Sequence, residues 1–310
     1  MSRISGDPVE VGQSASATTR HAMLSREASL WTLIIVAAIV ILACLLMPPI
    51  PQPQSYHHFA DERGLLGIPN FGDVVSNLPF AAIGIWGLVL LLRSHAEKRA
   101  EVFVDARELW PYLFVFAGLL LTAFGSAYYH LAPDNRRLVW DRLPMTITFM
   151  SLVAAIIAER INVRLGIWLL PMLLLVGPIS VLQWYWSETK GAGDLRFYAA
   201  VQAYSALAIL LALFFPRRYT RTADFGLVIG FYVIAKALEL FDKTVFRTLG
   251  VLSGHTLKHL AAAAAGYCIL RMLQKRKPIT SVSSVPCSGL ESTCFTLGVS
   301  ETIPSIRSHP

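Results

Sequence analysis

The chain has 310 residues, of which 55% are hydrophobic and 15% are charged, and its mean hydropathy is +0.53. Soluble globular proteins carry about 25% charged residues, so this composition excludes an ordinary soluble enzyme, and a mostly disordered chain as well. The formal net charge of +7 comes from basic residues in short clusters between long apolar runs. Such clusters are typical of membrane topology rather than nucleic-acid binding, and the sequence predicts a membrane-embedded protein with no nucleic-acid partner.

Eight apolar segments are long enough to cross a bilayer as helices, because one span needs about 20 residues. The first is an almost unbroken apolar run at residues 30–47, and we expect an extra N-terminal transmembrane helix at 29–48. A secretory signal peptide is the alternative, but no small-x-small cleavage site follows the run. The other seven segments lie near residues 73–93, 110–131, 138–159, 164–186, 195–215, 224–242 and 254–274. The expected fold is all-α, a polytopic membrane helix bundle with a seven-helix core plus the extra helix.

The distribution of basic residues predicts the orientation of this bundle. Eight spans place both termini on one side, where the loops and tails hold 17 Lys and Arg residues against 8 on the other side. Because cytoplasmic loops carry the excess of positive charge, we expect both termini in the cytoplasm. The ends of the chain are rich in Ser, Thr, Gly or Pro, which predicts a disordered N-terminal segment at 1–28 and a disordered tail at 278–310.

Three of the eight histidines lie inside the predicted spans or at their ends, where ionisable residues are costly and usually functional. His130 closes the third span, and His255 and His259 open the eighth, both at the side opposite the termini. Three imidazoles plus a water are the ligand set of a catalytic zinc site, and two ligands four residues apart lie on one face of a helix. A helix cap or an interfacial polar residue is the alternative for each histidine alone. The three together predict a metal centre.

Two further polar residues lie on the same side of the predicted bundle. Ser126 precedes His130 by four residues, and Asp141 opens the fourth span. Asp141 has a structural alternative as a first-turn acid that favours the helix dipole, or as the ion partner of Arg142. Ser126 has one as a helix serine bonded to its own backbone. In the catalytic hypothesis Asp141 transfers a proton and Ser126 stabilises an oxyanion.

The seventh predicted span carries a second set of charges. Lys236, Glu239 and Asp242 follow one another at intervals of three residues. An internal ion pair between Lys236 and Glu239 is the structural interpretation, and service to the metal site is the alternative. Lys258 is expected to point away from the site and to reach the interface. A transporter that uses these charges as an ion relay is a further alternative, but the sequence has no inverted repeat to support it.

The complete pattern resembles the alkaline ceramidase family, which belongs to a wider group of membrane hydrolases that includes the adiponectin-receptor-like proteins. The matching residues are Ser126-x-x-x-His130, Asp141 and His255-x-x-x-His259. The stretch 73–80 is also similar to the family's Asn-x-x-Ser-Asn-Leu motif, with Ser76 and Asn77 matched and Asp73 in place of the first Asn. The resemblance covers about residues 60–275, which would form the seven-helix hydrolase domain.

This resemblance implies a zinc-dependent amidase that cleaves the N-acyl bond of ceramide or a similar lipid, with a role in sphingolipid metabolism. It implies that His130, His255 and His259 bind zinc, that Asp141 lies near the zinc-bound water, and that Ser126 contacts the substrate carbonyl. The run at 59–64 looks like that of bacterial relatives. The expected location is therefore a bacterial inner membrane, with the zinc site on the extracytoplasmic side.

The family's calcium site is matched only in part. It uses an Asp-Trp-x-Glu-x-Asn run and a Glu just before the first core helix, whereas this chain has Asp61 and Glu62 in the run and Asn70 in place of the Glu. The resemblance therefore supports zinc as a cofactor but leaves calcium unsupported. Two functional alternatives stay open: a receptor-like protein of the same superfold with a structural zinc and no significant turnover, and a hydrolase for an ester bond.

Overall fold

The computed structural model describes residues 24–96 and 102–279, and within these residues the regular structure is helical, as the sequence predicts. The predicted disordered segments, 1–28 and 278–310, lie almost wholly outside the described residues. The helices in chain order are α1 (Arg26–Leu46), η1 (Gln54–His57), α2 (Phe71–Val75), α3 (Leu78–Ala96), η2 (Ala106–Glu108), α4 (Leu109–Leu131), α5 (Asn135–Arg160), α6 (Val163–Thr189), α7 (Arg196–Leu211), α8 (Asp224–Leu240), α9 (Asp242–Leu249) and α10 (Gly254–Lys275).

Five helical segments in the described part are long and apolar enough to cross a membrane, judged by length and composition. They are Arg26–Leu46, Phe71–Ala96, Ala106–Leu131, Asn135–Arg160 and Val163–Thr189. α7 is a shorter apolar helix. These helices are compatible with an integral, multi-pass membrane protein, and the count of seven core spans plus one stays a prediction.

Each of the eight apolar segments contains a helix, but the structure differs from the prediction in two places. The segment predicted at 73–93 is divided into α2 and α3 by a turn at Ser76 and Asn77, whose side chains donate to the carbonyl oxygen of Asp73 at 3.1 and 2.7 Å. α9 lies in a region that we expected to be a loop, and it ends at Gly250, whose φ of 71° suits glycine.

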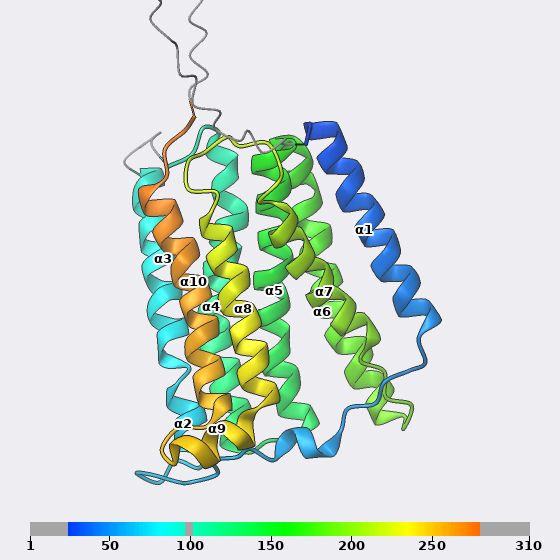
Figure 1. The fold of residues 1–310 in the computed structure, drawn as a ribbon, viewed down its shortest axis with the longest axis vertical. Helices are drawn as coiled ribbons and strands as arrows, with labels where there is room; N and C mark the ends of the chain where they lie inside the picture. Colours follow the sequence, from blue (N-terminus) through cyan, green and yellow to red (C-terminus); the bar gives the residue numbers. More distant parts are fainter. Residues whose placement is uncertain (1–23, 97–101, 280–310) are drawn as a thin grey trace, which may run out of the picture. The chain divides into compact units, whose positions relative to one another are not determined.

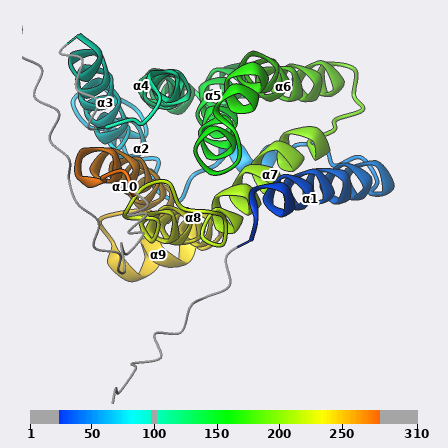
Figure 2. The same ribbon diagram turned by 90° about the horizontal axis from the view of Figure 1, so that it is seen from above.

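The long helices lie side by side in Figure 1, and the end-on view in Figure 2 places α5 between α4, α6 and α7. In its most apolar window α5 is 78% buried, whereas α1 is 17% buried and packs at the edge against α7. The segment that joins α1 to α2 crosses the end of the bundle where α2 and α9 lie (Figure 1). The same end holds the last turn of α4 and the first turn of α10.

Two glycines allow helices to approach closely at this end. A Cβ atom on Gly125 of α4 would lie 2.8 Å from the carbonyl carbon of Trp140 in α5. One on Gly254, the first residue of α10, would lie 2.7 Å from the Cα atom of Asp242. A side chain at either position would force two backbones apart, so the helix ends that carry the candidate site residues depend on both glycines.

Candidate metal centre

Three buried histidine rings meet between the end of α4 and the start of α10. The exposed fractions of His130, His255 and His259 are 0, 5 and 4%. Their ring centroids are 4.9, 4.9 and 5.0 Å apart, and one ligand nitrogen from each lies within 4.8 Å of the other two. The structure thus brings together the three predicted ligands, and the group has the spacing to hold a metal ion.

The start of α10 is fixed by hydrogen bonds from two directions. Ser253 is the N-cap residue, and its hydroxyl accepts from the backbone N–H of Thr256 at 2.9 Å. The carboxylate of Asp242 accepts from the backbone N–H of His255 at 2.8 Å and from that of Ala60 at 2.9 Å. Asp242 therefore orients one histidine of the site and ties the segment before α2 to α10, which is a structural role.

The ring nitrogens of His130 and His259 differ in their hydrogen bonding. Among the described residues, neither ring nitrogen of His130 has a hydrogen-bond partner, although buried polar atoms are almost always paired. The Ser76 hydroxyl donates to the carbonyl of Asp73, so its oxygen can accept from Nδ1 of His259, which lies 2.8 Å away. That bond leaves the Nε2 lone pair of His259 for a metal, as outer partners of metal-bound histidines do.

Phe59 covers one side of the histidine cluster. Its ring lies 4.7 Å from that of His130 and 4.6 Å from that of His255, and it is 6% exposed. Phe59 comes from the segment between α1 and α2, which carries no periodic pattern. The sequence analysis missed this contact, because nothing in a loop sequence indicates which rings its aromatic residue will meet.

Lys258 corrects one of our predictions. Its Nζ atom does not point away from the site but lies 3.1 Å from Nε2 of His255 and 2.9 Å from Oε1 of Glu239. Glu239 also pairs with Lys236 at 2.8 Å, which confirms the predicted ion pair, and accepts from the Tyr56 hydroxyl at 3.0 Å. An ammonium inside a membrane is stabilised by a carboxylate partner, and for Lys258 this partner lies within the bundle, so the side chain does not extend to the interface.

Ser126 and Asp141 lie close to the cluster, as predicted. Both are buried, and both line one pocket together with His259. The close approach of α4 and α5 at Gly125 brings their helices together at this level. A hydroxyl, a carboxylate and an imidazole therefore line one shared space.

Arg142 is not the ion partner of Asp141, although it follows it directly in the sequence. Its guanidinium donates to the side-chain oxygen of Gln52 at 2.7 Å and lies 4.2 Å from the ring of Trp184 and 4.7 Å from that of Tyr198. Neighbouring residues of a helix point in different directions. The Asp141 carboxylate is thus left to the pocket.

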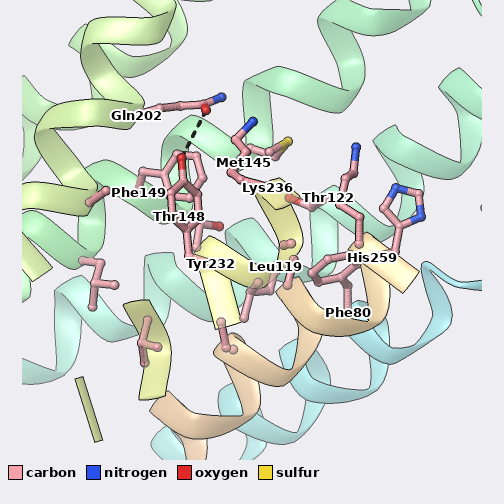
Figure 3. A pocket seen from close by; sticks show the side chains of 18 of the residues that line it. Phe80, Leu119, Thr122, Met145, Thr148, Phe149, Gln202, Tyr232, Lys236 and His259 are labelled. Carbon is pink, nitrogen blue, oxygen red and sulfur yellow. Dashed lines mark hydrogen bonds between the residues drawn. The ribbon is translucent and has the colours of Figure 1, made fainter. Parts of the chain in front are cut away.

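The pocket, shown in Figure 3, has a volume of about 140 Å³ and a mostly apolar lining. Its ionisable lining residues besides Tyr232 are Asp141, Lys236, Glu239, Lys258 and His259, and Ser126 adds a hydroxyl. Its apolar walls include Phe80, Leu119, Met145, Phe149, Leu152 and Ile269. Tyr232 and Gln202 are joined by a hydrogen bond of 3.4 Å across one wall (Figure 3). The lining suits a molecule with a polar group near His259 and an apolar chain against the apolar walls.

Asp61 and Glu62, the two acids in the region that corresponds to the family's calcium site, do not form a cation site together. The guanidinium of Arg63 binds both oxygens of Asp61, at 2.7 and 2.8 Å, and holds the pKa of that carboxyl below its ordinary value. Glu62 is exposed and lies 3.7 Å from His58. Within the described residues the histidine cluster is the one group with the spacing of a metal site.

Burial lowers the pKa of His57, whose ring nitrogens lie 2.9 Å from the hydroxyl of Tyr129 and 2.9 Å from the side-chain oxygen of Asn135.

No protein-family model and no curated protein matches this sequence. The main features of the site are a buried cluster of three histidines, an aromatic ring against it, and an adjoining pocket lined by an acid and a hydroxyl.

Proposed function

We propose that the chain is a zinc-dependent membrane hydrolase that cleaves the N-acyl amide bond of ceramide or a similar lipid, in a seven-helix domain with one helix added before it. The observation that carries this proposal is the buried triplet His130, His255 and His259, of which His259 also lines a mostly apolar pocket. Buried histidines alone would favour a structural metal site. The adjoining acid, hydroxyl and pocket favour chemistry on a bound lipid.

The donor set fits zinc. Three neutral imidazoles are the protein ligands of a catalytic zinc site with one open position, whereas calcium and magnesium prefer oxygen ligands. The unpartnered ring nitrogens of His130 and the bond between Ser76 and His259 are consistent with a bound metal. When bound, zinc would lower the pKa of a coordinated water from about 15.7 towards ~7 and polarise the substrate carbonyl.

The chain's own residues would transfer the proton, stabilise the carbonyl oxygen, exclude bulk water and bind the acyl chain. Asp141 would accept the proton of the attacking water and deliver it to the nitrogen of the leaving amine as the carbon–nitrogen bond breaks. The Ser126 hydroxyl would donate a hydrogen bond to the carbonyl oxygen as negative charge develops there. Phe59 would exclude bulk water from the side of the cluster that it covers. The apolar walls would hold the acyl chain.

The proposed location follows from the same geometry and from the charge distribution. The histidines lie at the end of the bundle where α4 ends and α10 begins, and the excess of basic residues lies at the other end. The positive-inside rule then favours cytoplasmic termini and an extracytoplasmic zinc site, and the run at 59–64 favours a bacterial inner membrane. A lipid amide at headgroup depth would reach such a site while its chains remain in hydrocarbon.

The test is fatty-acid release by purified protein from a panel of ceramides, N-acyl amino lipids and ester lipids, measured by mass spectrometry together with zinc content. We expect the wild type to hold about one zinc and to cleave an amide on the panel. His255→Ala should lose both zinc and turnover, whereas His95→Ala, which changes an exposed histidine on α3, should keep both. Asp141→Asn should retain zinc and lower kcat by about 10²–10⁴-fold.

Three results would count against the proposal. Turnover by a zinc-free His255→Ala protein would end the metal-activated water mechanism. A zinc-loaded wild type that cleaves nothing on the panel would favour the receptor-like alternative with a structural zinc. Cleavage restricted to esters would keep the hydrolase but replace the amide substrate.

A further inference from the structure

Four arginines surround a cavity at the end of the bundle opposite the histidines. The cavity, of about 350 Å³, lies where α1, α4 and α6 begin. Its arginines are Arg26, Arg107, Arg164 and Arg218. It continues into a groove of about 770 Å³ that shares Arg26 and Arg164. Leu30, Leu165 and Trp168 form the apolar part of this groove. The basic cavity and the apolar groove thus form one continuous surface between the first turns of α1 and α6.

Hydrogen bonds at both ends of α1 hold this surface in place. Near its first turn, the backbone N–H of Leu24 donates to the carbonyl of Phe214 at 3.2 Å. At the far end, the guanidinium of Arg196 donates to the carbonyl of Cys44 at 3.2 Å. α1 is therefore fixed as the outer wall of the groove, although it lies at the edge of the bundle (Figure 1) and only 17% of its most apolar stretch is buried.

The charges around the cavity are not balanced. Arg107 pairs with Asp105 at 2.7 Å, which holds the pKa of that carboxyl at about 2, and Arg218 pairs with Glu108 at 2.6 Å. Arg26 and Arg164 are exposed, and neither forms an ion pair with any residue in 24–96 or 102–279. The positive ends of the α1 and α6 dipoles lie at the same place. Glu27 also lines the groove and adds one negative charge. Four arginines therefore face three carboxylates, those of Glu27, Asp105 and Glu108, and the surface keeps an excess of one positive charge.

We propose that this surface binds one anionic phospholipid. Guanidinium groups bind phosphate through paired charge-assisted hydrogen bonds, and Arg26 and Arg164 are the two arginines available for this contact. Leu30, Leu165 and Trp168 would hold the upper part of an acyl chain. Basic pockets between transmembrane helices bind anionic head groups in this way. The occupant is a lipid rather than a soluble phosphate because the apolar groove continues directly from the arginines, and the side chain of Trp168 is 67% exposed there.

The experiment is a lipid titration of the purified, delipidated protein followed by native mass spectrometry. Phosphatidylglycerol and phosphatidylcholine with identical acyl chains are compared on wild type and on Arg26→Gln/Arg164→Gln. The control is Arg136→Gln/Lys243→Gln, which removes two exposed cations from the opposite end. We expect one tightly bound phosphatidylglycerol on wild type and control. Its affinity should be about 5-fold weaker for each arginine lost, so about 25-fold weaker in the double variant.

Further variants and ligands separate the other outcomes. Arg26→Lys/Arg164→Lys keeps the charge and should bind with intermediate affinity, which excludes misfolding as the cause of the loss. Equal binding of both lipids to wild type, or equal phosphatidylglycerol affinity in the double variant and the control, would overturn the proposal. Inorganic phosphate that binds as tightly as the lipid would show that the site takes a soluble anion, and the lipid assignment would then be wrong.

Discussion

Replacing Gly125 with alanine should separate α4 from α5 where Ser126 and Asp141 meet. The added Cβ atom would lie 2.8 Å from the carbonyl carbon of Trp140 and closer still to its oxygen, whereas ordinary contact begins at 3.4 Å. The obstructing atoms belong to the backbone of α5 and cannot rotate away. The two helices must therefore move apart by more than about 0.6 Å.

The size of the effect follows from two opposing contributions. Overpacking a well-packed interface costs about 1–3 kcal/mol, while alanine is favoured over glycine in a helix by about 1 kcal/mol. We expect Gly125→Ala to lower the free energy of unfolding by about 0–2 kcal/mol. Because a displacement of ~1 Å can slow a reaction about 100-fold, kcat for lipid cleavage should fall much more than stability does, with zinc retained.

Gly230→Ala is the matched control, because a Cβ atom at that position of α8 meets nothing within 4 Å. It should leave activity unchanged and keep or raise stability. Stability is measured by titrating purified protein with denaturing detergent and following its circular dichroism, and activity by fatty-acid release. If Gly125→Ala matched Gly230→Ala in both measurements, the close approach of α4 and α5 would not be what positions the site.

Three further predictions concern the metal centre. Ser76→Ala removes the partner of His259 Nδ1 and should weaken zinc binding about 10–100-fold in a competition titration with a chromogenic chelator. Asp242→Ala leaves the backbone N–H groups of His255 and Ala60 without their acceptor and should lower the free energy of unfolding by about 2 kcal/mol, measured by detergent titration. Chelation of the metal should lower Tm, and readdition of zinc should restore it. When free zinc is 100 times Kd, binding should raise the free energy of unfolding by about 2.7 kcal/mol.

Each of these predictions has an outcome that contradicts it. Ser94→Ala, which changes a serine far along α3, is the control and should bind zinc like wild type. If Ser76→Ala bound zinc as tightly as Ser94→Ala does, Ser76 would not support a metal ligand. Glu62→Ala, which removes an exposed acid, is the control for Asp242→Ala. If the two variants had the same free energy of unfolding, the bonds of Asp242 to His255 and Ala60 would not stabilise the fold. A Tm that ignores both chelator and added zinc would mean that the folded chain binds no metal.

Much of the helical structure could be predicted from the sequence, because apolar runs of membrane length leave few alternatives to a helix. The convergence of His130 with His255 and His259 was also predictable, since all three lie at span ends on one side of the predicted bundle. The short amphipathic helix α9 was missed because it lies outside the apolar runs that guided the prediction. The break after α2 was missed because a turn of two residues leaves little mark on the hydropathy of a long apolar segment.

Contacts of single side chains were less predictable. Lys258 was expected at the interface, but the sequence does not show that Glu239 on α8 lies within reach of α10. Arg142 follows Asp141 and was a natural ion partner, yet its guanidinium finds Gln52 and aromatic rings brought from distant segments. Periodicity tells which face of a helix a residue occupies, while the partner of that residue depends on how the helices pack.

The segment between α1 and α2 makes the first helix mechanically relevant to the metal centre. At one end its backbone is fastened to α6 and to the residue before α7, through bonds of Gln52 to Glu188 at 2.6 Å and of Leu195 to Ile50 at 2.8 Å. At the other end it is fastened at Ala60 to Asp242, and Phe59 lies between these anchor points. The Phe59 ring is thus held against the histidines by hydrogen bonds on both sides of it in the sequence. A displacement of α6 or of the start of α7 would therefore shift the segment that holds Phe59 against the three candidate ligand histidines.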